Sequence, residues 1–146
     1  MNQPGMAQRA RGSRPPTLNA LNYMELEEVL RFADAVVRVT LVSVQSKAIK
    51  PSPQDYPSTG HYDNAMLRGA HQTKVTLVRR IQMLSKDALI ELTTLFWFGR
   101  GDAPLSLLRN HAEKSDSTEL PYYLASQTHL AAYLMTGLQK LERGGF

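Results

Sequence analysis

The sequence of 146 residues contains no cysteine. This absence excludes a disulfide framework, a catalytic thiolate and a thiolate-bound metal, and it is compatible with a reducing compartment. Long apolar runs are missing as well, because the longest candidate, residues 35–44, is short and is interrupted by Arg38. A membrane-spanning helix needs about 20 predominantly apolar residues, so we predict a cytoplasmic protein without a membrane partner.

Motifs for catalysis or cofactor binding are missing too. The segment Gly99-Arg100-Gly101 is too short for a dinucleotide or phosphate loop, and no serine has the context of a nucleophile elbow. The histidines include no pair spaced four residues apart, so a zinc site would need the fold to bring them together with Asp63 or Glu113. These histidines are His61, His71, His111 and His129. We therefore expect no enzyme, no cofactor and no metal, and the enzymatic alternative would use His61, His71 or Arg100.

Acidic residues are absent from the first 20 residues, which carry Arg9, Arg11 and Arg14. Since the whole chain carries a net charge of +4 and this segment +3, the remainder is nearly neutral. The segment is rich in glycine, proline and glutamine, and it has too few large apolar side chains to offset the entropy of ordering. We predict a flexible, disordered basic arm over residues 1–20, and any polyanion would bind this arm.

The remainder of the chain is expected to form one domain over residues 21–143, followed by a short tail at 144–146. The composition of 42% hydrophobic and 21% charged residues is typical of a globular domain. Apolar residues recur at steps of three and four in several segments, which is the period of an amphipathic helix. The sequence therefore predicts an all-α, single-domain bundle of about five to six helices around a central apolar helix.

The first helix should begin at a capping box made by Asn22 and Glu25 and continue to about Ala48. Its β-branched residues 36–44 would also suit a strand, but the unbroken apolar stripe favours a helix. Residues 50–70 are rich in proline and glycine and indicate a long loop. The loop carries a candidate site made of Tyr56, His61, Tyr62 and Asp63.

A second helix should open at His71 and end near Met83, with Lys74, Arg79 and Arg80 facing water. Three further helices are expected after the central one. Their predicted starts are a cap by Asp102 with Pro104 in the first turn, a cap at Ser117, and a cap by Thr128.

The central helix is predicted over residues 86–98, with Ser85 as its cap and the single tryptophan, Trp97, near its end. Gly99 and Gly101 should stop it, since glycine tolerates the left-handed conformation that closes many helices. The segment is apolar over most of its circumference. We therefore expect it to be the most buried helix, with one side left to face a partner or a second copy.

Three segments carry a resemblance to a known family. They are Leu95-Phe-Trp-Phe-Gly-Arg-Gly-Asp102, Leu120-Pro-Tyr-Tyr-Leu-Ala125 and Leu130-Ala-Ala-Tyr-Leu-Met-Thr-Gly-Leu138. Together they resemble an uncharacterised family of small bacterial α-helical domains of unknown function that share a Trp-x-Gly-Arg-Gly-Asp turn. The resemblance covers about residues 85–141, and it implies a bacterial helical domain but no activity.

These observations favour a non-catalytic interaction protein that binds a protein complex or forms a homo-oligomer such as a homodimer. One setting for such a protein is a mobile element, where it would inhibit a host defence complex in the manner of an anti-CRISPR protein. The alternative is a nucleic-acid-binding regulator in which Arg9, Arg11 and Arg14 hold phosphates while Lys74, Arg79 and Arg80 approach the duplex. Arg100 could pair with Asp102, with a helix end or with an external anion.

Overall fold

The structure is a computed structural model that describes residues 13–48, 69 and 71–144. These residues form helices and no strand, which confirms the predicted all-α class. The helices are α1 (Tyr23–Ala48), α3 (Lys86–Arg100), α4 (Leu105–Glu113), α5 (Leu120–Ala125) and α6 (Leu130–Glu142). One more helix covers residues 71–82 and is called the 71–82 helix below.

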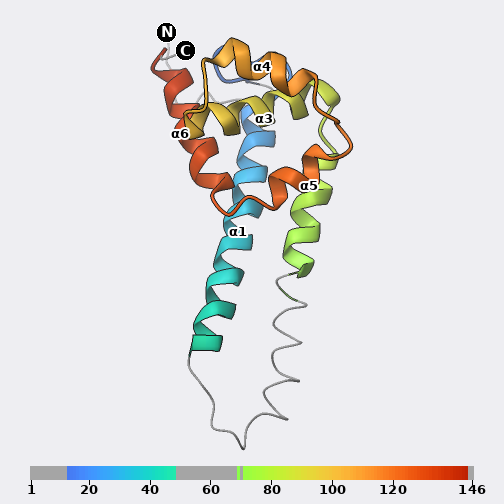
Figure 1. Cartoon of the computed structure of the whole chain (residues 1–146), viewed down its shortest axis with the longest axis vertical. Coiled ribbons are helices and arrows are strands. Elements are labelled where there is room, and N and C mark those ends of the chain that lie inside the picture. Colours follow the sequence, from blue (N-terminus) through green and yellow to red (C-terminus); the bar gives the residue numbers. More distant parts are fainter. Residues whose placement is uncertain (1–12, 49–68, 70, 145–146) are drawn as a thin grey trace, which may run out of the picture.

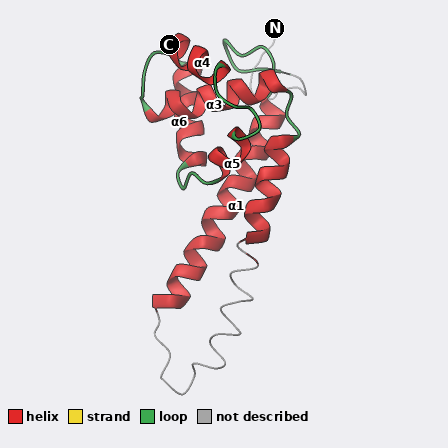
Figure 2. Cartoon of the chain, turned by 45° about the vertical axis from the view of Figure 1, so that its right-hand side comes forward, coloured by secondary structure: helices red, strands yellow, loops and turns green. Residues whose placement is uncertain are grey.

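The short helices gather at one end of the molecule around α3 (Figure 1). α1 and the 71–82 helix run side by side away from this end in both views (Figures 1 and 2). An ion pair between Arg80 and Glu28 ties these two helices together. No helix in the described ranges is long and apolar enough to cross a membrane.

The start of α1 follows the predicted capping box. The amide of Glu25 donates to Asn22 Oδ1 at 2.8 Å, and the amide of Asn22 donates to Glu25 Oε1 at 3.2 Å. α1 then continues as a helix through the β-branched residues 36–44. The preference for helix over strand in this segment is therefore confirmed.

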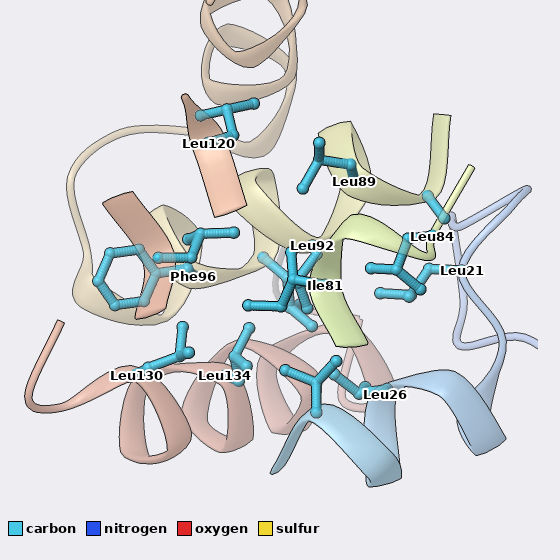
Figure 3. Packing of buried hydrophobic residues seen from close by; sticks show 14 of the residues in the cluster. Leu21, Leu26, Ile81, Leu84, Leu89, Leu92, Phe96, Leu120, Leu130 and Leu134 are labelled. Atoms are coloured by element: carbon cyan, nitrogen blue, oxygen red, sulfur yellow. The ribbon is translucent and has the colours of Figure 1, made fainter. Parts of the chain in front are cut away.

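α3 is the central helix of the domain, as predicted. Ser85 caps it by accepting a hydrogen bond from the amide of Ala88 at 3.1 Å, and every residue from Ala88 to Gly99 is buried. Its apolar side chains meet those of α1, α5, α6 and the 71–82 helix in one cluster (Figure 3). The described part of the chain thus covers most of α3, and the expectation that one of its sides faces a partner or a second copy stays a prediction.

The carboxyl end of α3 differs from the prediction at Gly99. The helix passes through Gly99 to Arg100 and ends at Gly101, whose φ of 87° lies in the left-handed region. Gly99 instead lies against α6, where a Cβ atom would come within 1.7 Å of the carbonyl oxygen of Tyr133. Gly99 therefore permits a close helix crossing, and only Gly101 acts as the predicted stop.

The predicted flexible arm over residues 1–20 is wrong for its described part. Leu18 and Leu21 are buried in the core, and the amide of Tyr23 donates to the carbonyl of Ser13 at 2.8 Å. Residues 13–20 therefore pack on the domain, because apolar burial and backbone hydrogen bonds offset the entropy of ordering them. Residues 1–12 lie outside the described part, as do 49–68, 70 and 145–146, which include most of the predicted loop and tail.

Three predicted helix caps are also wrong. α5 begins after Glu119 with no side-chain cap, so Ser117 does not cap it. α4 begins after Pro104 with no side-chain cap, since the carboxylate of Asp102 is taken by Arg100. α6 begins after His129, also without a side-chain cap, so Thr128 does not have the predicted role. These three helices are stabilised by the packing of their buried apolar residues, which contributes more to short helices than capping does.

Candidate functional site

An open cleft of about 630 Å³ lies where the carboxyl end of α3 meets α4 and α5. Trp97, Leu108 and Leu120 are buried residues of its apolar wall, and Leu107 of α4 stands at the rim with 59% of its surface exposed. The remaining lining residues are Arg100, Asp102, Ala103, His111, Ser115 and Tyr123. Clefts with an apolar wall and a few fixed polar groups are typical binding sites.

The indole of Trp97 is held in place from two sides. Its Nε1 donates a hydrogen bond to the hydroxyl of Tyr123 at 2.9 Å, which satisfies the polar atom of a buried ring. The imidazole of His111 packs against it with the ring centres 5.1 Å apart. The aromatic wall is therefore fixed by contacts from both α4 and α5.

Arg100 and Asp102 form an ion pair at the rim of the cleft. Arg100 Nε donates to both carboxylate oxygens of Asp102 at 3.0 Å, and a terminal nitrogen donates to Oδ2 at 2.6 Å. This hydrogen bonding raises the pKa of Arg100 and lowers the pKa of Asp102. The guanidinium also lies over the ring of Phe96, 5.1 Å from its centre.

The turn that follows α3 allows Arg100 and Asp102 to pair although they are only two residues apart in the chain. Gly101 takes the left-handed conformation, and its amide donates to the carbonyls of Phe98 and Trp97. The turn brings Asp102 back beside Arg100, two residues earlier in the chain. Trp97, Gly101 and Asp102, which were predicted to be structural, thus lie at one place, although Asp102 pairs with Arg100 and does not cap α4. Of the three alternatives for Arg100, pairing with Asp102 is the one found.

The cationic residues predicted to contact a partner lie elsewhere and have different surroundings. Lys74 and Arg79 are exposed and line a second hollow, on the 71–82 helix, together with His71. Arg80 lies beside them in sequence but is paired with Glu28, and its side chain is 16% exposed. Arg80 was predicted to face water, and this ion pair makes that prediction wrong. Its contact with nucleic acid stays a prediction.

The other predicted residues do not join these sites. Arg14 is exposed. His129 packs its ring against that of Tyr133 on α6. Within the described ranges, no three histidine or acidic side chains gather as a metal site would require. Arg9 and Arg11 of the arm and Tyr56, His61, Tyr62 and Asp63 of the loop lie outside the described residues.

The residue that the sequence analysis missed is Glu91 on α3. Its side chain is 1% exposed and accepts hydrogen bonds from the amides of Asn19, Ala20 and Leu21 at 2.8 to 2.9 Å. Arg109 of α4 forms an ion pair with it. Burial opposes the ionised form, but the amide hydrogen bonds and the charge of Arg109 outweigh burial and lower the pKa of Glu91.

A signal for Glu91 was present in the sequence, because it is the one acidic residue inside the apolar run from Ala88 to Phe98. Buried acids are almost always paired or hydrogen-bonded. Its partners, however, lie 18 and about 70 residues away along the chain. Helical periodicity alone does not identify contacts at such distances.

Residues 74–142 match the model of a family described as a protein of unknown function (DUF3775). The match confirms the family resemblance found in the sequence over about residues 85–141, and it extends this resemblance into the 71–82 helix. It therefore includes all residues that line the cleft. Neither the curated proteins nor the solved structures contain a significant match to the chain.

Proposed function

Because residues 74–142 match a family whose function is unknown, we propose from the geometry that the protein is a non-catalytic binding protein. Its site would be the cleft between α3, α4 and α5, and its ligand an apolar side chain presented by a segment of a partner protein. The observation that carries this proposal is the apolar wall around Trp97, with the exposed Leu107 at its rim. Buried aromatic and apolar anchors of this kind supply much of the affinity of protein interfaces.

The polar groups of the cleft support binding over catalysis. Ser115 and His111 both line it, but the hydroxyl of Ser115 donates to the backbone carbonyl of His111 at 3.1 Å. A serine nucleophile would instead need its hydroxyl on the imidazole. Arg100 and Asp102 neutralise each other, and the indole nitrogen is satisfied by Tyr123.

Arg100 indicates which group should lie beside the apolar side chain of the proposed ligand. Its guanidinium has five N–H donors, and Asp102 occupies only one edge of it. A carboxylate next to the apolar side chain of the partner could therefore bind the remaining donors at the rim. The proposed ligand is a short segment with one large apolar residue and an acid close to it.

The test compares Leu107→Asp with Met135→Asp in a capture experiment from the organism that encodes the protein. Both residues are exposed, and Met135 lies on α6 outside the cleft. Partners retained by the parent and by Met135→Asp, but not by Leu107→Asp, are then made as tryptophan-free peptides. Trp97 is the only tryptophan, so its emission reports occupation of the cleft directly.

We expect these peptides to shift the Trp97 emission of the parent and of Met135→Asp with similar affinity. Leu107→Asp should bind about tenfold more weakly or worse, because a charge on the apolar rim must be desolvated. Equal affinity of Leu107→Asp and the parent, or binding without any change in Trp97 emission, would contradict the proposal.

The finer hypotheses stay predictions. A bacterial, cytoplasmic inhibitor of a host defence complex, anti-CRISPR-like in action, is supported if the captured partner is a subunit of such a complex. A homo-oligomer is tested by light scattering of the purified protein. The enzymatic alternative with His61, His71 or Arg100 also stays a prediction; His71 and Arg100 line separate hollows, and His61 lies outside the described residues.

A further inference from the structure

The 71–82 helix carries cations and no acid. From His71 to Lys86 the sequence holds Lys74, Arg79, Arg80 and Lys86, and the next acidic residue is Asp87. Glu28 neutralises Arg80, whereas Lys74 and Arg79 form no ion pair with any described residue. Two uncompensated cations therefore face outward from one helix.

These two cations border a hollow that also contains an aromatic ring. The hollow has a volume of about 400 Å³ and lies between the 71–82 helix and α5, which are neighbours in Figures 1 and 2. Tyr122 of α5 is its aromatic member and is 54% exposed. Gln82 Nε2 donates to the hydroxyl of Tyr122 at 3.3 Å, and Val75 and Val78 add an apolar floor.

This combination matches the chemistry of a nucleotide in a single strand. Phosphates bind lysine and arginine, and a base stacks on an exposed aromatic ring. A duplex keeps the faces of its bases stacked on one another, so a hollow with one tyrosine suits an unpaired base better. Glu119 lines an adjoining hollow that shares Gln82 and Tyr122, and its charge would repel phosphates there.

We propose that this surface binds single-stranded nucleic acid, with phosphates on Lys74 and Arg79 and one base stacked on Tyr122. The surface is separate from the cleft, since the two share no lining residue. It also differs from duplex binding by the whole helix, because Arg80 is held by Glu28. RNA and DNA offer the same phosphates and bases here, and the experiment separates them.

The experiment measures the fluorescence anisotropy of labelled oligothymidine and oligouridine of about 12 nucleotides, bound to the full chain. The charge variant is Lys74→Gln with Arg79→Gln. Its matched control is Lys114→Gln with Arg143→Gln, which removes one lysine and one arginine that are also exposed. Both variants keep the arginines of the amino-terminal segment, so any contribution from that segment is the same in each.

We expect the charge variant to bind at least about tenfold more weakly than the control. Its plot of log affinity against log salt should also be less steep by about 1.4, which is the effect of two lost phosphate contacts on a single strand. Tyr122→Ala should weaken binding by about tenfold through the loss of stacking, and Tyr122→Phe should retain binding. A higher affinity for one of the two oligonucleotides identifies RNA or DNA as the ligand.

Several results would overturn the proposal. They are equal weakening in the control and charge variants, unchanged affinity in Tyr122→Ala, or stronger binding to a duplex of the same length. Equally tight binding of a labelled polyglutamate peptide would assign the surface to acidic proteins. Absence of oligonucleotide binding by the parent at low salt would likewise reject it. Leu107→Asp should bind the oligonucleotides like the parent, so this test is independent of the cleft.

Discussion

At the scale of single residues, Glu91 links three parts of the molecule through one carboxylate. It lies on α3, accepts the amides of residues 19–21 and pairs with Arg109 of α4. Each hydrogen bond to a charged group contributes about 1.5 to 3 kcal/mol in proteins. The amino-terminal segment is therefore held in part by a residue far from it in the sequence.

Glu91→Gln should lower the free energy of unfolding by about 3 kcal/mol. The amide keeps one acceptor oxygen but loses the charge, and it leaves Arg109 without its partner. Urea denaturation measures the loss. Glu113→Gln on α4 is the control, since Glu113 is exposed and should change stability by less than about 0.5 kcal/mol. Similar stabilities of the two variants would show that the buried carboxylate contributes little.

The lowered pKa of Glu91 also predicts how stability depends on pH. The unfolded chain takes up the proton near the ordinary value of about 4.3, while the folded protein takes it up only at lower pH. The contribution of Glu91 is therefore complete above this value and is lost as the pH falls through the folded pKa.

Urea denaturation from pH 7 to pH 3 tests this prediction. In the acidic range, the parent should lose up to about 1.4 kcal/mol more per pH unit than Glu91→Gln does. Asp102 and Asp116, whose pKa values are also lowered, are present in both proteins, so their contributions cancel in the comparison. Parallel pH profiles would contradict the prediction.

At the scale of elements, the crossing of α3 and α6 depends on two glycines. Gly99 on α3 and Gly137 on α6 face each other, and a Cβ on Gly137 would come within 2.5 Å of the carbonyl oxygen of Leu95. Small residues let two backbones approach closely, as at this contact. Larger residues would separate the two helices and open the core around Leu95.

Gly99→Ala should destabilise the protein by about 3 kcal/mol or more, because its Cβ meets backbone that cannot move independently. In an unhindered helix the same change stabilises the protein by up to about 1 kcal/mol. A loss of stability would therefore show that the Cβ is crowded. Gly101→Ala is the comparison, since nothing lies near its Cβ and only its positive φ opposes the change. Its cost should be about 1 kcal/mol. Thermal denaturation measures both, and a neutral Gly99→Ala would refute the close crossing.

At the scale of the whole molecule, the amino-terminal segment and the helices around α3 form one packed unit. Leu18 and Leu21 belong to the same apolar cluster as Leu92 and Phe96 of α3. The binding surfaces proposed here lie on the outside of this unit, on different helices. The core thereby holds two separate surfaces in fixed positions.

Hydrogen exchange should show that the amino-terminal segment and the helices around α3 unfold together. The amides of Asn19, Ala20 and Leu21 lie outside any helix, yet they should exchange as slowly as amides that open only with the domain. In Glu91→Gln the same amides should exchange faster, while those in the middle of α6 stay comparatively protected. Fast exchange of these three amides in the parent would show that the segment opens independently.

The sequence by itself determined the helical class, the central place of α3, the capping box of α1 and the ends of α3 at Ser85 and Gly101. These features depend on apolar periodicity and on hydrogen bonds between residues three or four apart, so a local pattern contains their cause. The family resemblance was also local, because its motifs are short and ordered along the chain.

Tertiary structure alone decided that residues 13–20 pack on the domain, what Glu91 and Gly99 do, and that Arg80 pairs with Glu28. It also brought Trp97, Leu107 and Tyr123 together as a cleft. The partners in these contacts are mostly distant in the sequence, and each contact forms only when several helices pack at once. The sequence specifies the helices and their apolar faces, whereas the physical environment of each polar residue is set by which faces meet.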